Sequence, residues 1–114
     1  MNYITFPGII ETNIEETLKI RLIKFCQENP KYQFIASWDQ VAICGKKNRK
    51  PYMVLVRQMY HYLIKRHTSL SLKEIGDLTG GHDHTTVMYS ITTIQDLLYT
   101  KDPETMKLYN YLNI

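Results

Sequence analysis

Apolar residues recur every three or four positions through most of the chain, which is the period of an amphipathic helix. A capping-box sequence, Thr-Asn-Ile-Glu at residues 12–15, opens the first such stripe, which ends at Asn29. A second capping box at residues 37–40 predicts a short helix over 38–44, and residues 31–36 read as a loop. The core-facing positions of these two helices are expected to be Ile14, Leu18, Leu22, Phe25, Trp38, Val41 and either Ile43 or Cys44.

A longer helix is predicted over residues 52–67, because Pro51 suits the first turn, where a missing N–H costs nothing. Its spacing leaves Arg57, Lys65 and Arg66 available on the outside. The core face of this helix is expected to consist of Val56, Met59, Tyr60, Leu63 and Ile64.

The sequence predicts the starts of three further helices in the second half of the chain. A capping box at residues 71–74 predicts a helix over 72–78, which the Gly80-Gly81 pair ends with a tight turn. Asp83 is the expected N-cap of a helix that reaches about Tyr99, and the Asp-Pro pair at 102–103 opens the last one. The inward positions are expected to be Ile75, Leu78, Val87, Ile91, Ile94, Leu98, Leu108, Tyr109 and Leu112.

No segment shows sustained period-2 alternation, so the pattern predicts an all-α bundle of about six helices. The 114 residues suit one small domain. We expect an N-terminal arm over 1–11 and a single helical domain over 12–114, with a helix-turn-helix at about 71–99. In such a unit the first turn of the second helix meets base edges in the major groove.

The outward face of that second helix suits a groove of DNA. Helical spacing places Thr85, Met88 and Thr92 opposite the predicted apolar stripe. A threonine hydroxyl can bond a phosphate or a base, and threonine and methionine can both pack on a thymine methyl. Many helical hairpins share this spacing, so the pattern is suggestive without being specific.

Charge adds to this picture by its placement. The net charge is only +3, but residues 40–73 hold eight basic residues and no acidic one. A solvated helix face explains such a run, and so does a phosphate-binding surface. The eight are Lys46, Lys47, Arg49, Lys50, Arg57, Lys65, Arg66 and Lys73.

Composition narrows the class of protein. Hydrophobic residues make up 44% and charged residues 22%, which is typical of a globular domain. The two cysteines, Cys26 and Cys44, form no CxxC pair, which argues against a disulfide scaffold or a zinc ribbon. The N-terminus has no signal-peptide pattern and no stretch is apolar enough to span a membrane, so we expect a cytoplasmic, nucleoid-associated protein.

One motif then makes the hypothesis specific. The run Gly80 to Val87, GGHDHTTV, closely resembles the GGRDHTTV signature of the C-terminal DNA-binding domain of the bacterial replication initiator DnaA family. The upstream segments RQM at 57–59 and SLKEIG at 71–76 resemble the same family at gapless spacing. The resemblance is specific over about 45–99, roughly half of the chain.

The resemblance implies a fold and a set of roles. The fold is a Trp-repressor-like helix-turn-helix domain, and the partner is double-stranded DNA at sites like the initiator's nonamer box. The residues expected to contact bases are Asp83, His84, Thr85, Thr86, Met88 and, from the basic loop into the minor groove, Arg49. The residues expected to contact phosphates are Lys46, Lys47, Lys50, Arg57, Gln58, Lys65 and His82.

Three departures from the family stand out. His82 replaces the signature arginine, and the connection over 29–36 is longer than usual. The ATPase module is missing, since the chain has no GxxxxGK[ST] motif. We therefore expect a stand-alone, non-enzymatic DNA-binding domain that needs no cofactor or nucleotide, acts as a monomer on DNA, and serves replication or transcription in a bacterium, a phage or a mobile element.

Other interpretations stay open. A protein-interaction adaptor that has lost DNA binding would keep the same fold. His82, Asp83 and His84 suggest a metal site with His61, His67 or Asp96 as further ligands, although three converging ligands are needed and no spacing supports them. The cysteines suggest a redox pair, but plain burial is favoured. Four tyrosines could stack on single strands, but packing explains their spacing better: Tyr60, Tyr62, Tyr109 and Tyr111.

Overall fold

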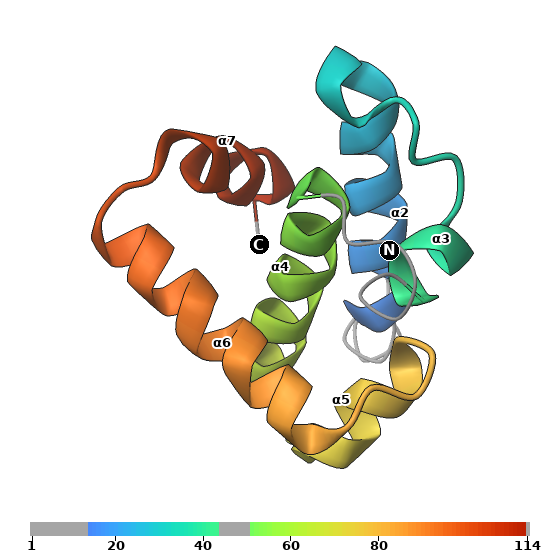
Figure 1. Ribbon diagram of the computed structural model, residues 1–114, viewed down its shortest axis with the longest axis vertical. Coiled ribbons are helices and arrows are strands. Elements are labelled where there is room, and N and C mark those ends of the chain that lie inside the picture. Colours follow the sequence, from blue (N-terminus) through green and yellow to red (C-terminus); the bar gives the residue numbers. More distant parts are fainter. Residues whose placement is uncertain (1–13, 44–50, 114) are drawn as a thin grey trace, which may run out of the picture.

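The computed structural model describes residues 14–43 and 51–113, and within these ranges the chain is helical, with no strand (Figure 1). The predicted all-α class is therefore confirmed. None of the described helices is long and apolar enough to cross a bilayer. The elements are α2 (Ile14–Glu28), the 3-10 helix η1 (Pro30–Tyr32), α3 (Trp38–Ile43), α4 (Pro51–His67), α5 (Leu72–Leu78), α6 (His84–Tyr99) and α7 (Pro103–Leu112). The predicted arm over 1–11 and the basic loop lie outside the described residues.

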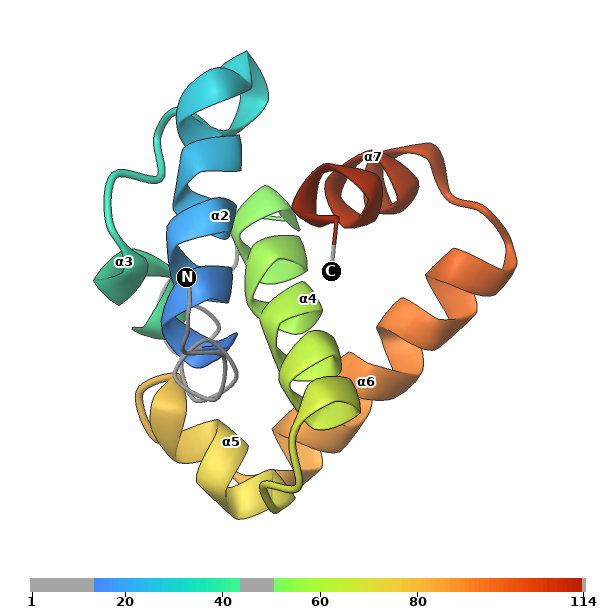
Figure 2. The same cartoon turned by 180° about the vertical axis from the view of Figure 1, so that it is seen from behind.

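Helix α4 forms the centre of the molecule, with α2 on one side and α6 on the other (Figures 1 and 2). All five residues predicted for its core face are buried: Val56, Met59, Tyr60, Leu63 and Ile64. The expectation that Arg57 lies outside is wrong, because only 6% of this residue is exposed. Helix α4 is packed on several sides, so the aliphatic stem of an arginine is covered there as well.

One end of the molecule is held by aromatic rings. The ring of Phe25 on α2 lies edge-on to Tyr32 at 5.0 Å and to Tyr111 of α7 at 5.2 Å between centroids. The prediction of a loop over 31–36 is wrong at its start, where η1 forms with Pro30 in its first turn and buries Tyr32. We call the part formed by α2, η1 and α7 the support end.

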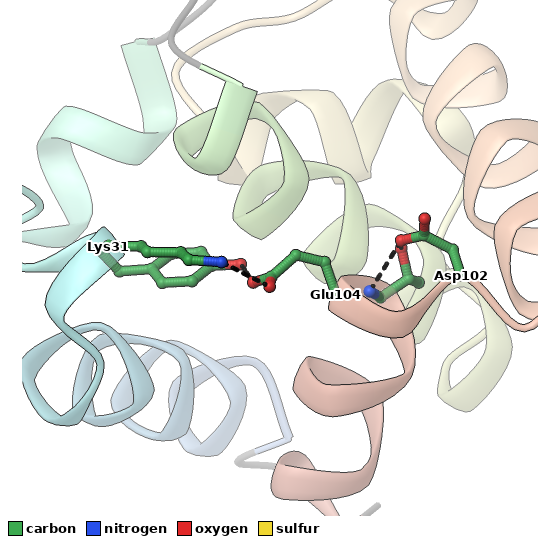
Figure 3. Close-up of polar contacts among 5 residues, drawn as sticks. Lys31, Asp102 and Glu104 are labelled. Atoms are coloured by element: carbon green, nitrogen blue, oxygen red, sulfur yellow. Dashed lines mark hydrogen bonds and ion pairs between the residues drawn. The ribbon is translucent and has the colours of Figure 1, made fainter.

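Polar contacts join η1 to the first turn of α7 at this end (Figure 3). The Tyr32 hydroxyl donates to Glu104 over 2.5 Å, and Lys31 pairs with the same carboxylate at 3.4 Å. These contacts keep the pKa of Glu104 below its usual value, with the Tyr32 hydrogen bond as the main cause. Asp102 caps α7, as predicted, by accepting from the Thr105 amide at 3.0 Å and from its hydroxyl at 2.8 Å.

Candidate nucleic-acid interface

Helices α5 and α6 form the predicted helix-turn-helix, and α5 begins and ends where the sequence indicates. The Ser71 hydroxyl accepts from the Glu74 amide at 3.1 Å, and the Glu74 carboxylate accepts from the Ser71 amide at 2.8 Å. This reciprocal capping box satisfies two backbone donors that a helix start otherwise leaves without partners.

The turn between the two helices is held at one backbone oxygen. The amides of Gly81 and His82 both donate to the Gly76 carbonyl, at 3.0 and 3.1 Å. Gly80 and Gly81 have φ values of +81° and +85°, in the left-handed region that favours glycine. A Cβ on Gly76 would lie 1.9 Å from the His82 carbonyl oxygen, so the approach of the turn to α5 requires glycine there.

Asp83 starts α6 as its N-cap, as predicted. Its carboxylate accepts from the Thr86 amide at 2.9 Å, and this bond is the main cause that holds the pKa of Asp83 below its usual value. The carboxylate therefore stays ionised at the positive end of the helix dipole. An acidic residue at a position predicted to face DNA is thus explained first by helix capping.

The two faces of α6 separate as predicted. Val87 and Ile94 are fully buried, whereas Thr85, Met88 and Thr92 are exposed. The sequence did not predict that Ser90 lies on the buried face. It also missed Tyr89, which is 67% exposed next to Met88. Helical spacing was the available signal, because it places Tyr89 opposite the apolar stripe that contains Val87 and Ile94.

A hollow of about 440 Å³ lies where α4 passes the start of α6. Arg57 and Gln58 line it from α4, and the α6 side brings Asp83, Thr85 and Thr86. Val54, His82 and Tyr89 complete the lining. The structure thus brings together residues predicted to hold phosphates and residues predicted to read bases, although they are about 25 positions apart in the sequence. Buried Arg57 still borders this surface.

His82, which replaces the arginine of the signature, lies against α3. Only 8% of the residue is exposed, and its Nε2 donates to the Ala42 carbonyl oxygen at 2.7 Å. A carbonyl oxygen only accepts, so the ring proton at this bond belongs to Nε2. The turn of the helix-turn-helix is therefore anchored to α3 by this imidazole. Its predicted phosphate contact stays a prediction.

The remaining predicted contacts lie around the hollow or beyond the described residues. His84 and Met88 are exposed on α6. Lys65 lines a separate, smaller hollow of about 290 Å³ with Tyr62, Arg66, Ile91 and Gln95. The loop residues that were predicted to contact DNA fall in the range 44–50, which the structure does not describe: Lys46, Lys47, Arg49 and Lys50.

The residues considered for a metal site, a redox pair and single-strand stacking have other surroundings in the structure. His61 is fully buried and its two ring nitrogens lie within hydrogen-bond distance of Ser90 and Thr79. Within 14–43 and 51–113, no three His, Cys, Asp or Glu residues gather as a metal site would require. Cys26 is buried, as predicted, and burial raises the pKa of its thiol to about 12. The tyrosines predicted to pack are buried or half-buried: Tyr60, Tyr62, Tyr109 and Tyr111.

Comparison with known proteins gives one consistent result. The model of a family described as "Bacterial dnaA protein helix-turn-helix" matches residues 38–94, half of the chain, from α3 into α6. The chain is 53% identical over 49 residues to "Chromosomal replication initiator protein DnaA" of Thermus thermophilus, which covers 43% of the chain and 11% of that protein. No solved structure matches the chain.

Two other relatives of the same name extend the match. The protein from Picosynechococcus sp. is 44% identical over 66 residues, or 58% of this chain and 14% of the relative. The protein from Jannaschia sp. is 35% identical over 80 residues, or 70% of this chain and 16% of the relative. The chain thus matches only a small part of the length of these proteins.

Proposed function

The chain belongs to the family of bacterial DnaA helix-turn-helix domains, and from this premise we propose that it binds double-stranded DNA in a sequence-specific manner. The first turn of α6 would enter the major groove, and Arg49 of the basic loop would enter the minor groove. The preferred site would resemble the nonamer box of the initiator. The protein would act as a monomer without nucleotide or catalytic activity, on the nucleoid, in the control of replication or transcription.

The observation that carries this proposal is the hollow between α4 and α6. One wall bears Arg57 and Gln58, a charged and a polar donor suited to phosphate oxygens. The other bears Thr85 and Thr86, whose hydroxyl and methyl groups suit base edges. Phosphate contacts would set the register of the protein on the duplex, and base contacts would set the choice of sequence.

Charge supports this division of roles. Arg57 and Lys65 on α4 belong to the basic stretch 40–73, whereas α6 itself carries no lysine or arginine. A helix that reads bases gains little from extra positive charge, because charge strengthens binding to every sequence alike. The loop lysines Lys46, Lys47 and Lys50 would add phosphate contacts beside Arg49.

A titration tests the proposal. Fluorescence anisotropy would compare a labelled duplex that contains the nonamer box with a scrambled duplex of equal length, at 50 mM and 200 mM salt as rough settings. We expect tighter binding to the box duplex. The ratio of the dissociation constants for the scrambled and box duplexes should grow at the higher salt, because non-specific binding weakens there. Equal, weak binding to both duplexes would overturn sequence-specific recognition.

One observation favours a second candidate, a protein-interaction adaptor. A hollow of about 540 Å³ between α2 and the start of α3 is lined by Ile20, Ile23 and Trp38 with charged residues around them, and Ile20 is 67% exposed. An exposed apolar side chain beside an apolar hollow suits contact with another protein. Failure of both duplexes to bind in the titration would favour this adaptor role.

A further inference from the structure

A chain of buried polar side chains connects three helices behind the DNA-facing surface. His61 of α4 places Nδ1 2.9 Å from the Ser90 hydroxyl of α6 and Nε2 2.7 Å from the Thr79 hydroxyl at the end of α5. None of the three residues exposes any surface. We call this set the imidazole bridge. The proposed contacts with DNA do not use it.

Each end of the bridge reaches the backbone of the helix-turn-helix. The Ser90 hydroxyl lies 3.1 Å from the Thr86 carbonyl oxygen, in the turn of α6 that borders the hollow. The Thr79 hydroxyl lies 3.2 Å from the carbonyl oxygen of Gly76, which also accepts the amides of the turn. The ring on α4 therefore contacts one hydroxyl beside the first turn of α6 and another at the end of α5.

The protonation state of His61 determines which groups donate and which accept in the imidazole bridge. Burial, with Arg57 and His82 nearby, lowers the pKa of the His61 imidazole to about 3, so at neutral pH the ring carries one N–H. One ring nitrogen donates to its hydroxyl, and the other accepts from its hydroxyl. A hydroxyl has one proton, so the hydroxyl that donates to the ring cannot also donate to a backbone carbonyl. The ring tautomer therefore determines whether the carbonyl bond is kept by Ser90 in α6 or by Thr79 at the end of α5.

Position along α4 explains why this matters for DNA. Arg57 precedes His61 by four residues, one helical turn, and lines the hollow from the same helix. The bridge thus connects the helix that carries Arg57 to the turn of α6 that carries Thr86. Hydrogen bonds have narrow distance and angle ranges, so they hold two helices at one offset more sharply than apolar contacts do.

We propose that His61 is a positioning residue for DNA recognition, which, through Ser90 and Thr79, sets the offset of the first turn of α6 from Arg57 and Gln58. The inference rests on the proposed function, since it assigns to the bridge the geometry on which base reading depends. Sites held by such supporting residues lose discrimination when the support is removed, even though the residues that touch the ligand are unchanged.

Two conservative variants test the proposal. Ser90→Ala and Thr79→Val each remove one hydroxyl and leave every proposed DNA contact in place. The ratio of the dissociation constants for scrambled and box duplexes is expected to fall by about threefold to thirtyfold in each variant. Binding to the scrambled duplex and its salt dependence should stay as in the wild type, because phosphate contacts need less exact placement.

The matched control is Thr105→Val. This variant also removes a fully buried threonine hydroxyl, but in α7, where the partner is Asp102. It should lower the melting temperature to an extent comparable with the two test variants and leave the duplex ratio unchanged. If Ser90→Ala and Thr79→Val lower stability and leave the ratio unchanged as well, the bridge is purely structural and the proposal is overturned.

Amide hydrogen exchange without DNA separates this inference from the proposed function. We expect faster exchange at the Thr86 amide in Ser90→Ala and at the Gly81 and His82 amides in Thr79→Val, with no change in either variant at Met106 in the first turn of α7. If the wild type does not discriminate between duplexes, the proposed function fails and exchange alone decides. Selective acceleration then supports the positioning role, and equal change in α6 and α7 overturns it.

Discussion

We call the part formed by α5, α6 and the facing part of α4 the recognition end, after its proposed role. This end and the support end are held together by different kinds of contact. At the recognition end, buried hydrogen bonds join α4, α5 and α6 through His61, Thr79 and Ser90, and the turn converges on the Gly76 carbonyl. At the support end, aromatic rings pack around Phe25, and polar contacts lie at the edge.

The difference follows from what each end is proposed to do. Apolar and aromatic packing contributes stability that depends mainly on buried area and tolerates small shifts. Buried hydrogen bonds contribute little net stability but penalise displacement strongly. A surface that discriminates among base pairs needs the second property. Changes at the support end should therefore alter stability alone, and changes at the recognition end should alter discrimination as well.

The largest expected effect comes from Gly76→Ala, which places a Cβ where the turn of the recognition end approaches α5. The added Cβ would lie 1.9 Å from the His82 carbonyl oxygen, and neither backbone segment can yield easily. We expect the free energy of unfolding to fall by about 3 kcal/mol or more. Urea denaturation with an unchanged m-value measures it. The neighbouring exposed Asp77→Ala is the control, and a loss no greater than the control's would contradict the rigid turn.

Acidification is the next largest effect and acts on His61. The ring has a pKa near 6.5 when unfolded and about 3 when folded, so below pH 6.5 the unfolded state binds more protons. The contribution of His61 to stability is therefore fully present above pH 6.5 and is lost as the pH falls towards 3. From pH 7 to pH 5 the free energy of unfolding should decrease by about 2 kcal/mol from this residue.

His61→Leu isolates the contribution of this residue from those of all other titratable groups. The leucine variant keeps a filled core, and Ser90 and Thr79 retain carbonyl acceptors for their hydroxyls. Chemical denaturation at pH 7 and pH 5 should show a flatter pH dependence than in the wild type. An equally steep dependence in both proteins would mean that the buried imidazole is not the source.

A smaller effect is expected from Tyr32→Phe at the support end. The variant loses the 2.5 Å hydrogen bond to Glu104 and keeps the ring that packs on Phe25. The free energy of unfolding should fall by about 1–2 kcal/mol, with no change in the duplex ratio. Tyr111→Phe, which loses an exposed bond to Glu28, is the milder control. A changed ratio in Tyr32→Phe would remove the distinction between the two ends.

The smallest effect is expected at the exposed pair Lys73–Asp77 on α5. Both side chains are mostly exposed at an N–O distance of 3.3 Å, where water and salt screen the attraction. Lys73→Ala should leave the melting temperature unchanged within error at low and high salt. A clear fall in melting temperature that depends on salt would contradict this and would show that the charge pair contributes to the stability of the recognition end.

The ends of the helices could be predicted well because their signals are local. The capping box at Ser71 and the N-cap Asp83 act on amides three residues away, and the structure has α5 and α6 at the predicted bounds. The 3-10 helix at Pro30 was missed because its stability depends on Tyr32 packing against Phe25, a contact that no local pattern reports.

The site could be predicted only in part, because spacing gives the face of a helix and not its neighbours. Thr85 and Met88 are exposed as the period required. Arg57 was expected outside, but α4 is covered on several sides. His61 was considered only as a metal ligand, since its partners Thr79 and Ser90 lie 18 and 29 residues away in the sequence. Only the folded arrangement brings them together.

The most direct test of the central claim is the ratio of dissociation constants for scrambled and box duplexes in Thr85→Ala and Lys65→Ala. If the first turn of α6 reads bases, Thr85→Ala should reduce discrimination by about 1–3 kcal/mol, and His84→Ala should do the same. Lys65→Ala should instead weaken both duplexes equally and reduce the salt slope by about 1. An identical response of Thr85→Ala and Lys65→Ala would contradict the division between reading and positioning residues.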